Sequence, residues 1–324
     1  MRNSRVKQQL PSVSPVDYRF KAMGGEFQLF SYLKSYSNEK AEKIFALVEK
    51  EVIRIENKFT DFRESPFQMI NEKAGRERVF VDEEIFNLVK RSLDFSIKTN
   101  GIFDISFASV GHLWREAKRS NKRLGYLDRI VASRLIDYKK IELDENNLSI
   151  FLPHPKMRIS LGGIGKGYAI DRAYKILKEF GFANFYVNGA GDIRVHSEAN
   201  APRKWRFGIQ NPLAHDFDKK IGVIQISQGS ISSSGGYAAR NNLNGDTRDH
   251  HIISPRSGIS NRKVIATTVY TPTAIESDVY ATSLMNMKPD EGLSFMEKEQ
   301  LAGMIVTDEG RCLLSKKALK NFGI

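Results

Sequence analysis

Ser160-Leu-Gly-Gly-Ile-Gly-Lys-Gly-Tyr-Ala-Ile-Asp171 holds four glycines and one lysine in one short segment. The apolar residues Met157 to Leu161 predict a strand before the glycines, and a helix is predicted to begin near Gly165. Glycines let the backbone approach a ligand closely, and the free N–H groups and dipole at a helix start favour an anion. Because Lys166 adds a mobile positive charge, the segment predicts a site for phosphate or pyrophosphate.

Two well-known phosphate loops do not match this segment. A Walker loop requires Gly where Ser160 stands, and Ser or Thr where Gly167 follows the lysine. The dinucleotide fingerprint requires a third Gly where Tyr168 stands. A tight strand-to-helix turn with a solvated lysine is therefore an alternative interpretation of the same residues.

The composition indicates a globular protein with a basic surface. The chain has 324 residues, 41% of them hydrophobic, which is enough to bury a large core. The net charge of +12 suggests anionic partners. Because the Lys and Arg residues are spread along the chain without a known binding motif, we expect no nucleic-acid partner. The single cysteine, Cys312, excludes an internal disulfide and a cysteine-based metal cluster.

The chain carries no predicted membrane or export signal. No apolar run approaches the ~20 residues that a transmembrane helix needs. The charged N-terminal segment lacks the apolar stretch of a signal peptide. We therefore expect a cytoplasmic protein, or an exported one if the true start lies elsewhere.

The order of predicted elements favours an α+β fold, with mixed or antiparallel sheets and packed helices. Residues 1–16 are predicted to be a disordered lead-in and residues 17–324 a single domain. Helices are predicted at 38–59, 83–99 and 165–180 and after Thr273, the second with Ile85, Val89, Leu93 and Ile97 inward. Strands are predicted at 16–20, 26–32, 140–143, 148–152, 184–187, 205–209, 222–226 and 264–271. Residues 121–139 are predicted to form an irregular surface excursion and 230–236 a serine- and glycine-rich turn.

Asp278 and Thr282 are candidate metal ligands. They lie four residues apart on the predicted helix after Thr273, so they share one face. Their oxygens suit a hard cation such as Mg²⁺. Two protein ligands would leave coordination positions of the cation for waters and substrate phosphate. The alternative is a solvated Asp and a Thr that is bonded to its own helical turn.

Three polar segments could serve a reaction at phosphate. His250-His251 offers an imidazole suited to acid–base work, or is a polar surface pair. The turns Asn188 to Asp192 and Ser232 to Tyr237 could present backbone amides to a ligand, or be plain turns.

Seven motifs, taken in order from about Phe20 to Thr307, resemble those of the ApbE family of FAD:protein FMN transferases. The motifs are Met23-Gly24-Gly25, Phe103-Asp104, Leu161 to Asp171, Val187 to Asp192, Ser234 to Tyr237, His251 to Gly258 and Ala274 to Ser283. Each motif is modest alone, but their shared order and spacing are specific. Ser160 and Ser254 stand where family members usually carry Asp.

The resemblance implies a single ApbE-type domain with a Mg²⁺-dependent, or Mn²⁺-dependent, site for FAD. The family cleaves the FAD pyrophosphate, moves FMN onto a Thr or Ser hydroxyl of an acceptor protein, and releases AMP. It implies metal ligation by Asp278, Thr282 and the backbone carbonyl of Gly165, and proton removal from the acceptor hydroxyl by His251. It also implies FAD contacts at Met23, Asp104, Gly163, Lys166, Asn188, Gly189, Asp192, Ser234 and His251.

Other functions remain open at this point. The same site could hydrolyse FAD to FMN and AMP, with water as the acceptor. A flavin-binding module without turnover is a second alternative, and a nucleic-acid-binding protein, suggested by charge alone, is a third. The sequence leaves the acceptor protein and the oligomeric state unassigned.

Overall fold

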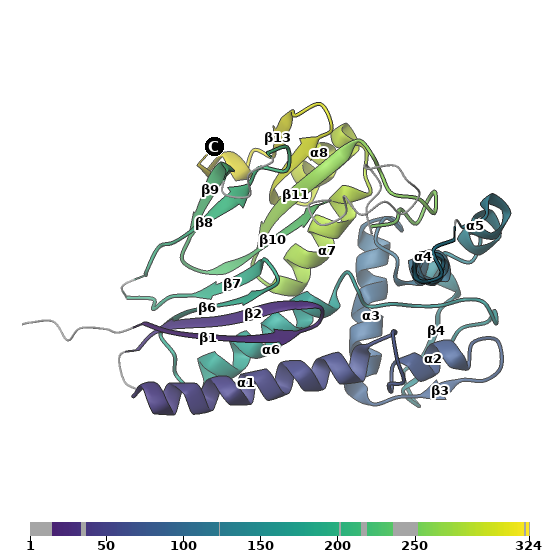
Figure 1. Cartoon of the computed structure of the whole chain (residues 1–324), viewed down its shortest axis with the longest axis horizontal. Coiled ribbons are helices and arrows are strands. Elements are labelled where there is room, and N and C mark those ends of the chain that lie inside the picture. Colours follow the sequence, from purple (N-terminus) through teal and green to yellow (C-terminus); the bar gives the residue numbers. More distant parts are fainter. Residues whose placement is uncertain are drawn as a thin grey trace, which may run out of the picture.

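An eight-stranded antiparallel sheet runs through the molecule (Figure 1). The computed structural model describes residues 15–33, 37–122, 124–200, 202–214, 219–235, 252–320 and 322–323. The strand order is β1 (Pro15–Ala22), β2 (Gly25–Tyr32), β6 (Asn184–Gly189), β7 (Asp192–His196), β10 (Gly229–Gly235), β11 (Val264–Thr271), β12 (Ala302–Thr307) and β13 (Cys312–Leu314). Residues 1–14 of the predicted lead-in lie outside the described residues. The division of the chain into a lead-in and a single domain therefore stays a prediction.

Helices cover one face of this sheet and a small sheet covers the other. On the helical side lie α1 (Asn38–Phe59), α6 (Gly165–Glu179), α7 (Ala274–Met285) and α8 (Pro289–Lys298). On the opposite side, β8 (Trp205–Gln210), β9 (Lys220–Ile226) and β14 (Phe322–Gly323) pack through Trp205 and Ile224. In the part of the chain that is described, no helix is long and apolar enough to cross a membrane.

A second group of helices lies beside one end of the main sheet (Figure 1). It comprises α2 (Gln68–Glu72), α3 (Glu83–Lys98), α4 (Ala108–Arg119), α5 (Tyr126–Ser133) and the short helices Ile105–Phe107 and Tyr138–Lys140. A small sheet of β3 (Val79–Phe80), β5 (Ser149–Phe151) and β4 (Glu142–Asp144) completes it. The last short helix, Ala318–Lys320, precedes β14. The predicted α+β class is confirmed.

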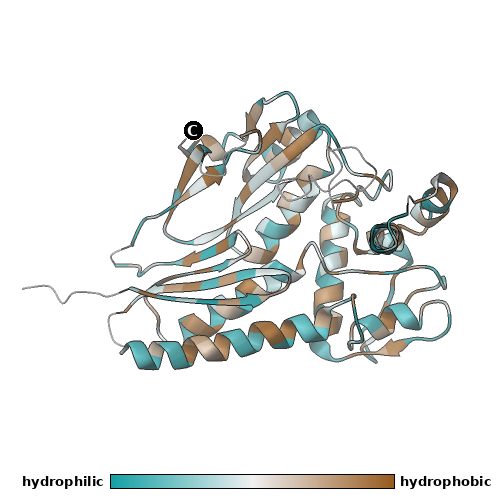
Figure 2. Ribbon diagram, in the orientation of Figure 1, coloured by the Kyte–Doolittle hydropathy of each residue, from teal (hydrophilic) through white to brown (hydrophobic). Residues whose placement is uncertain are grey.

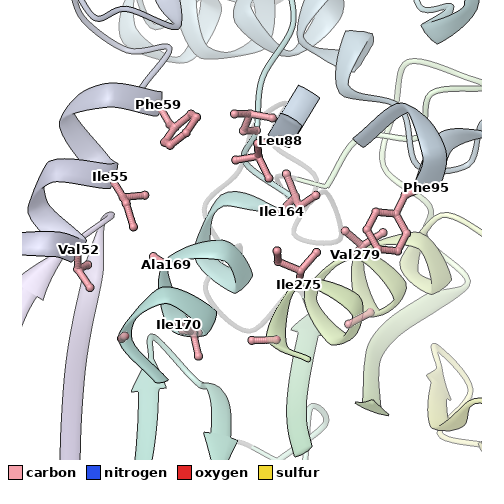
Figure 3. Packing of buried hydrophobic residues seen from close by; sticks show 14 of the residues in the cluster. Val52, Ile55, Phe59, Leu88, Phe95, Ile164, Ala169, Ile170, Ile275 and Val279 are labelled. Carbon is pink, nitrogen blue, oxygen red and sulfur yellow. The ribbon is translucent and has the colours of Figure 1, made fainter. Parts of the chain in front are cut away.

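The long helix α1 has the predicted bounds because its apolar residues keep helical spacing. Ser37 caps its start by accepting a hydrogen bond from the Lys40 amide. Hydrophobic and hydrophilic residues alternate along its length (Figure 2). The predicted stripe is buried, namely Ala41, Ile44, Phe45, Val48, Val52, Ile55 and Phe59. This stripe and the apolar faces of α6 and α7 meet in one core (Figure 3).

The segment Ser160 to Asp171 fixes α7 against α6. This contact has no room for a side chain at Gly167, since a Cβ placed there would lie 2.5 Å from the Ala274 carbonyl oxygen. One turn later, the Asp171 carboxylate accepts hydrogen bonds from the amides of Ala274 at 2.7 Å and Ile275 at 3.1 Å. Arg194 pairs with the same carboxylate at 2.5 Å. The glycine segment of α6 therefore also holds the start of the helix that carries Asp278.

Replacing Gly167 by Ala is expected to lower the free energy of unfolding by about 2–3 kcal/mol, because the added methyl group must push α7 away. Urea unfolding would measure the change. Gly162→Ala is the matched control, since a Cβ there would lie 3.6 Å from Ser160 Oγ, an ordinary contact. Equal stability of the two variants would contradict this account of the α6–α7 contact.

The predicted strand at Met157 to Leu161 is wrong. The segment is held by a side chain in place of a neighbouring strand. The Ile159 amide donates to Asn71 Oδ1 at 2.7 Å, and Asn71 Nδ2 donates to the Ile159 carbonyl at 2.9 Å. The Ser160 amide then donates to the Ile105 carbonyl at 2.9 Å. One buried amide side chain therefore satisfies the backbone that the apolar pattern assigned to a sheet.

The predicted turn at 230–236 is also wrong over its described residues, because β10 is an inner strand of the main sheet. Its serines are satisfied by local partners. Ser232 and Ser277 hydroxyls lie 2.8 Å apart, and those of Ser233 and Thr268 lie 2.9 Å apart. Small hydroxyl side chains let α7 approach the sheet here, so their polarity does not mark a loop.

Two details of the second group of helices also differ from the prediction. Asp82 caps α3 as predicted, but Ile97 is 64% exposed. The buried face instead passes through Leu88, Ser92 and Phe95. The helix α5 lies within the predicted irregular excursion 121–139. Charged residues interrupt the apolar pattern of α5, so the sequence did not predict this helix. In the structure α5 packs against α4, with Ala132 beside Val110 and Trp114.

Candidate active site

Two cavities meet at the glycine segment. The first, of about 430 Å³, is lined by Ile102 to Ile105, Phe107, Ser160, Gly162, Gly163, Lys166, Ala190, Asp192, Ser233 to Gly235, Ile252, Ile253, Pro255, Asp278, Thr282 and Asn286. The second, of about 460 Å³, is lined by Met23, Gly24, Glu56, Phe59 to Arg63, Leu161, Gly162, Gly165 and Lys166. Gly162 and Lys166 line both cavities. An elongated ligand could therefore cross the glycine segment and place one end in each cavity.

A lysine and two carboxylates form the charged centre of this site. Lys166, in the first turn of α6, places its Nζ against Asp192 Oδ2 and 3.3 Å from Asp278 Oδ1. The Gly167 amide donates to Asp278 Oδ2 at 3.0 Å. Both carboxylate side chains are only 4% exposed. Two carboxylates and one ammonium leave one net negative charge, which a cation would balance.

Burial and charge change the proton affinities in this cluster. Burial raises the pKa of Asp192 to about 6, although the nearby Lys166 ammonium opposes the rise. Burial alone would lower the pKa of Lys166, but Asp192 and Asp278 raise it above its ordinary value. Lys166 therefore stays charged near neutrality, while Asp192 titrates only slightly below it.

Thr282 follows Asp278 by one turn of α7, as the spacing predicted. It is half-buried and lies beside the loop, since its hydroxyl oxygen is 3.7 Å from a Cβ placed on Gly163. Gly165 is the first residue of α6, and Met23 Cε lies 3.6 Å from a Cβ placed there. The structure thus brings the predicted residues Gly163, Gly165, Lys166, Asp278 and Thr282 to one place.

Asp104 lies in the wall of the first cavity and anchors the chain locally. Its Oδ1 accepts from the Ser106 amide at 2.8 Å and hydroxyl at 2.6 Å, and its Oδ2 accepts from the Tyr138 amide at 2.9 Å. Burial raises its pKa. Both oxygens therefore already have protein partners, so a contact with FAD would share them.

The remaining predicted FAD contacts divide into three groups. Ser234 and Asp192 line the first cavity, whereas Asn188 and Gly189 line neither cavity. Asn188 Oδ1 instead accepts from the Gly191 amide at 2.9 Å and so closes the turn between β6 and β7. His251 lies outside the described residues, and the next residue, Ile252, lines the first cavity.

The sequence analysis did not assign several residues of the cavity walls to the site, and Phe62 and Asn286 are two of them. Phe62 is 70% exposed at the second cavity, with the Arg115 guanidinium 4.4 Å from its ring centroid. Asn286 lies one turn after Thr282 and lines the first cavity. The four-residue spacing of Asp278 and Thr282, continued once more, reaches Asn286 and was the available signal. No comparable spacing marks Phe62.

The fold and site define a class of α+β proteins, in which a glycine segment at a helix start brings a lysine between two buried carboxylates. Residues 23–305 match the model of the ApbE family. This chain therefore belongs to the ApbE family.

Named relatives and solved structures agree with this assignment. A Klebsiella pneumoniae (strain 342) protein, named FAD:protein FMN transferase, is 28% identical over 288 residues, 87% of each chain. An Escherichia coli (strain K12) protein with the same name is 26% identical over 76% of this chain and 72% of its own. The crystal structure of the ApbE protein from Thermotoga maritima has a TM-score of 0.86 at 25% identity, covering 95% of this chain and 99% of that one. The flavin transferase ApbE of Vibrio cholerae shares the fold at 18% identity, with a TM-score of 0.80, 95% of this chain and 99% of that one covered.

Proposed function

We propose that this protein transfers FMN from FAD to a Thr or Ser hydroxyl of an acceptor protein, in a Mg²⁺-dependent reaction that releases AMP. The observation that carries the proposal is the cluster of Lys166 with the buried carboxylates of Asp192 and Asp278, placed between two cavities at the start of α6. The names of the Klebsiella and Escherichia relatives support it. FAD has a pyrophosphate between two flat ring systems, which matches a charged centre between two cavities.

The residues present fit a divalent cation. The cluster has one uncompensated negative charge, and the Thr282 hydroxyl shares the face of α7 that carries Asp278. Among the described residues, no three His, Cys, Asp or Glu side chains come together as a metal-binding group. We propose that Asp278, Thr282 and the Gly165 carbonyl hold the cation, and waters and phosphate oxygens complete its shell. Bound Mg²⁺ would neutralise charge on the pyrophosphate oxygens.

Side chains of this protein would bind the substrate and remove the proton. Lys166 would bind the pyrophosphate, because the amides of Gly165 and Gly167 at the start of α6 already donate to the Leu161 carbonyl and to Asp278. The acceptor hydroxyl oxygen would attack the phosphorus of the FMN half, and the bond to the AMP phosphate would break. His251 would take the hydroxyl proton, because a neutral hydroxyl needs a base. A planar ring of FAD would stack on the exposed face of Phe62.

The affinity for Mg²⁺ is expected to be about ten-fold weaker at pH 5 than at pH 7.5. Below its pKa of about 6, Asp192 is mostly protonated, so Lys166 is balanced by Asp278 alone. The cluster then has no negative charge left for the cation. Calorimetric titration with MgCl₂ at both pH values would measure this. An unchanged affinity would contradict the role given to Asp192.

The transfer itself is tested by intact mass. The chain is incubated with FAD, Mg²⁺ and a Thr-bearing flavin-acceptor domain, and the acceptor is weighed. A mass gain of one FMN residue with release of AMP supports the transferase. FMN and AMP without a labelled acceptor would indicate FAD hydrolysis. Bound but intact FAD would indicate a flavin-binding module without turnover.

A further inference from the structure

The helix α5, at the outer end of the second group of helices, has an exposed apolar face (Figure 1). Leu127 is 75% exposed and Val131 is 54% exposed. These two residues lie four positions apart, so they share one face of the helix. The buried residue Ala132 packs in the opposite direction, against Val110 and Trp114 of α4. One side of α5 is therefore fixed to the protein, and the other side presents two large apolar side chains to solvent.

This helix lies beside one wall of the first cavity. Ile253 and Pro255 line the cavity, and Ile253 also belongs to the buried cluster that joins α4 to α5. A few residues later, the Gly258 carbonyl accepts a hydrogen bond from Trp114 Nε1 at 3.2 Å. A Cβ placed on Gly258 would lie 3.5 Å from side-chain atoms of α5. The next residue, Ile259, is 39% exposed. The segment that forms a wall of the cavity therefore continues to the exposed surface next to α5.

Positive charge flanks α5 along the chain. Residues 115–140 contain nine Lys and Arg residues against three Asp and Glu residues, which is half of the net charge of +12. Four exposed side chains of this segment have no ion-pair partner among the described residues, namely Lys118, Arg119, Lys122 and Arg134. On α1 and α3, by contrast, Lys43 pairs with Glu39 and Lys90 pairs with Glu145, each at 2.6 Å. The region around α5 is therefore complementary to a partner with acidic groups.

A protein fits this surface better than a membrane or a nucleic acid. The eight residues of α5 span only about 12 Å, and two exposed apolar side chains are too few to anchor a helix in a bilayer. A nucleic acid would use the positive charge but would leave Leu127 and Val131 without a role. Protein interfaces commonly combine a few apolar side chains at the centre with a charged rim.

We propose that the acceptor protein docks on the α5 surface, which comprises Leu127, Val131, Ile259, Lys118, Arg119, Lys122 and Arg134. The inference rests on the proposed function. The acceptor presents acidic and apolar side chains close to the hydroxyl that receives FMN. Docking at α5 places this hydroxyl beside the first cavity, so the α5 surface selects the acceptor and does not contact FAD.

The apolar part of the surface is tested with the double variant Leu127→Ser and Val131→Ser. FMN transfer is followed by intact mass over a range of concentrations of a Thr-bearing flavin-acceptor domain that the wild-type chain labels. We expect the KM for the acceptor to rise about ten-fold, with kcat within about two-fold of the wild type. The affinity for FAD should stay unchanged, because neither residue lines either cavity. Leu319→Ser is the matched control, since Leu319 is 67% exposed and also lines neither cavity.

The charged part of the surface is tested with Lys122→Glu. We expect the KM for the acceptor to rise about five-fold at low salt, and the difference from the wild type to shrink at about 0.5 M NaCl, because salt screens exposed charges. Lys50→Glu is the matched control. Lys50 is exposed on α1 and has no ion-pair partner among the described residues. Its replacement should leave the KM for the acceptor unchanged.

The outcomes are distinct. Absence of FMN transfer by the wild-type chain would defeat the proposed function and this inference with it. Transfer by the wild type with an unchanged KM in both surface variants would defeat this inference alone. An equal loss of FAD affinity and acceptor affinity would show a structural effect, and the inference would be wrong. Binding to vesicles of phosphatidylglycerol that the double variant loses, with an unchanged KM for the acceptor, would assign the surface to a membrane instead.

Discussion

Replacing Asp278 by Asn is expected to lower the rate of FMN transfer by about 10³-fold, because the variant loses the charge that balances a divalent cation. Asn is nearly isosteric, and its side-chain oxygen still accepts from the Gly167 amide, which lies 3.0 Å from Asp278 Oδ2. The fold should therefore persist, with thermal unfolding close to that of the wild type. AMP release and the intact mass of the acceptor measure the loss.

Thr282 offers the matched control for the metal assignment. Thr282→Ser keeps the hydroxyl and should retain most of the activity, whereas Thr282→Val keeps the shape and removes the oxygen. Transfer by Asp278→Asn within about ten-fold of the wild-type rate would remove Asp278 from the proposed metal ligands.

Replacing Lys166 by Met is expected to lower the free energy of unfolding at pH 8 by about 3–5 kcal/mol, since it leaves two buried carboxylates without their shared ammonium. The deficit should shrink as the pH falls. Without Lys166, the pKa of Asp192 rises above the value of about 6 that burial already produces. The folded chain then takes up a proton more readily than the unfolded chain, so proton binding stabilises it at low pH.

Urea unfolding at pH 8 and pH 5.5 measures this effect. Lys166→Arg is the control, because it keeps the positive charge beside Asp192 and Asp278. Mg²⁺ should also raise the melting temperature of Lys166→Met more than that of the wild type, since the cation replaces the lost charge. A free energy of unfolding equal to the wild type at both pH values would show that Lys166 is not needed to balance these carboxylates.

The sequence predicted elements well where the pattern was local and strong. The bounds of α1 and β11 agree with the prediction, because α1 keeps one hydrophobic period along its length and β11 is one continuous run of apolar, Thr and Tyr residues that is mostly buried. The errors at Met157 to Leu161 and at Ser230 to Gly235 have a different origin. In both places the decisive hydrogen-bond partners are distant in sequence, Asn71 for the first and Ser277 and Thr268 for the second. The local amino-acid composition therefore does not predict such partners.

The candidate site shows the same division. The glycine segment, Lys166, Asp278 and Thr282 could be named because each belongs to a motif or a helical spacing. Their meeting could not be derived, since it depends on the absence of a side chain at Gly167. Phe62 and Asn286 belong to no recognised motif. The position of Phe62 becomes evident only from the folded chain, whereas that of Asn286 follows from the four-residue spacing of Asp278 and Thr282.

The hydrogen bonds that the first amides of α7 donate to Asp171 have a consequence for the order of folding. Asp171 and Ala274 are 103 residues apart, and Lys166 and Asp278 are 112 apart. Loop-closure entropy makes such long-range contacts late events, after nearby strands such as β6 and β7 have paired. We therefore expect the charged cluster to assemble late in folding. Incompletely folded chains would then lack the site altogether, so a ligand of this site would bind only to completely folded molecules.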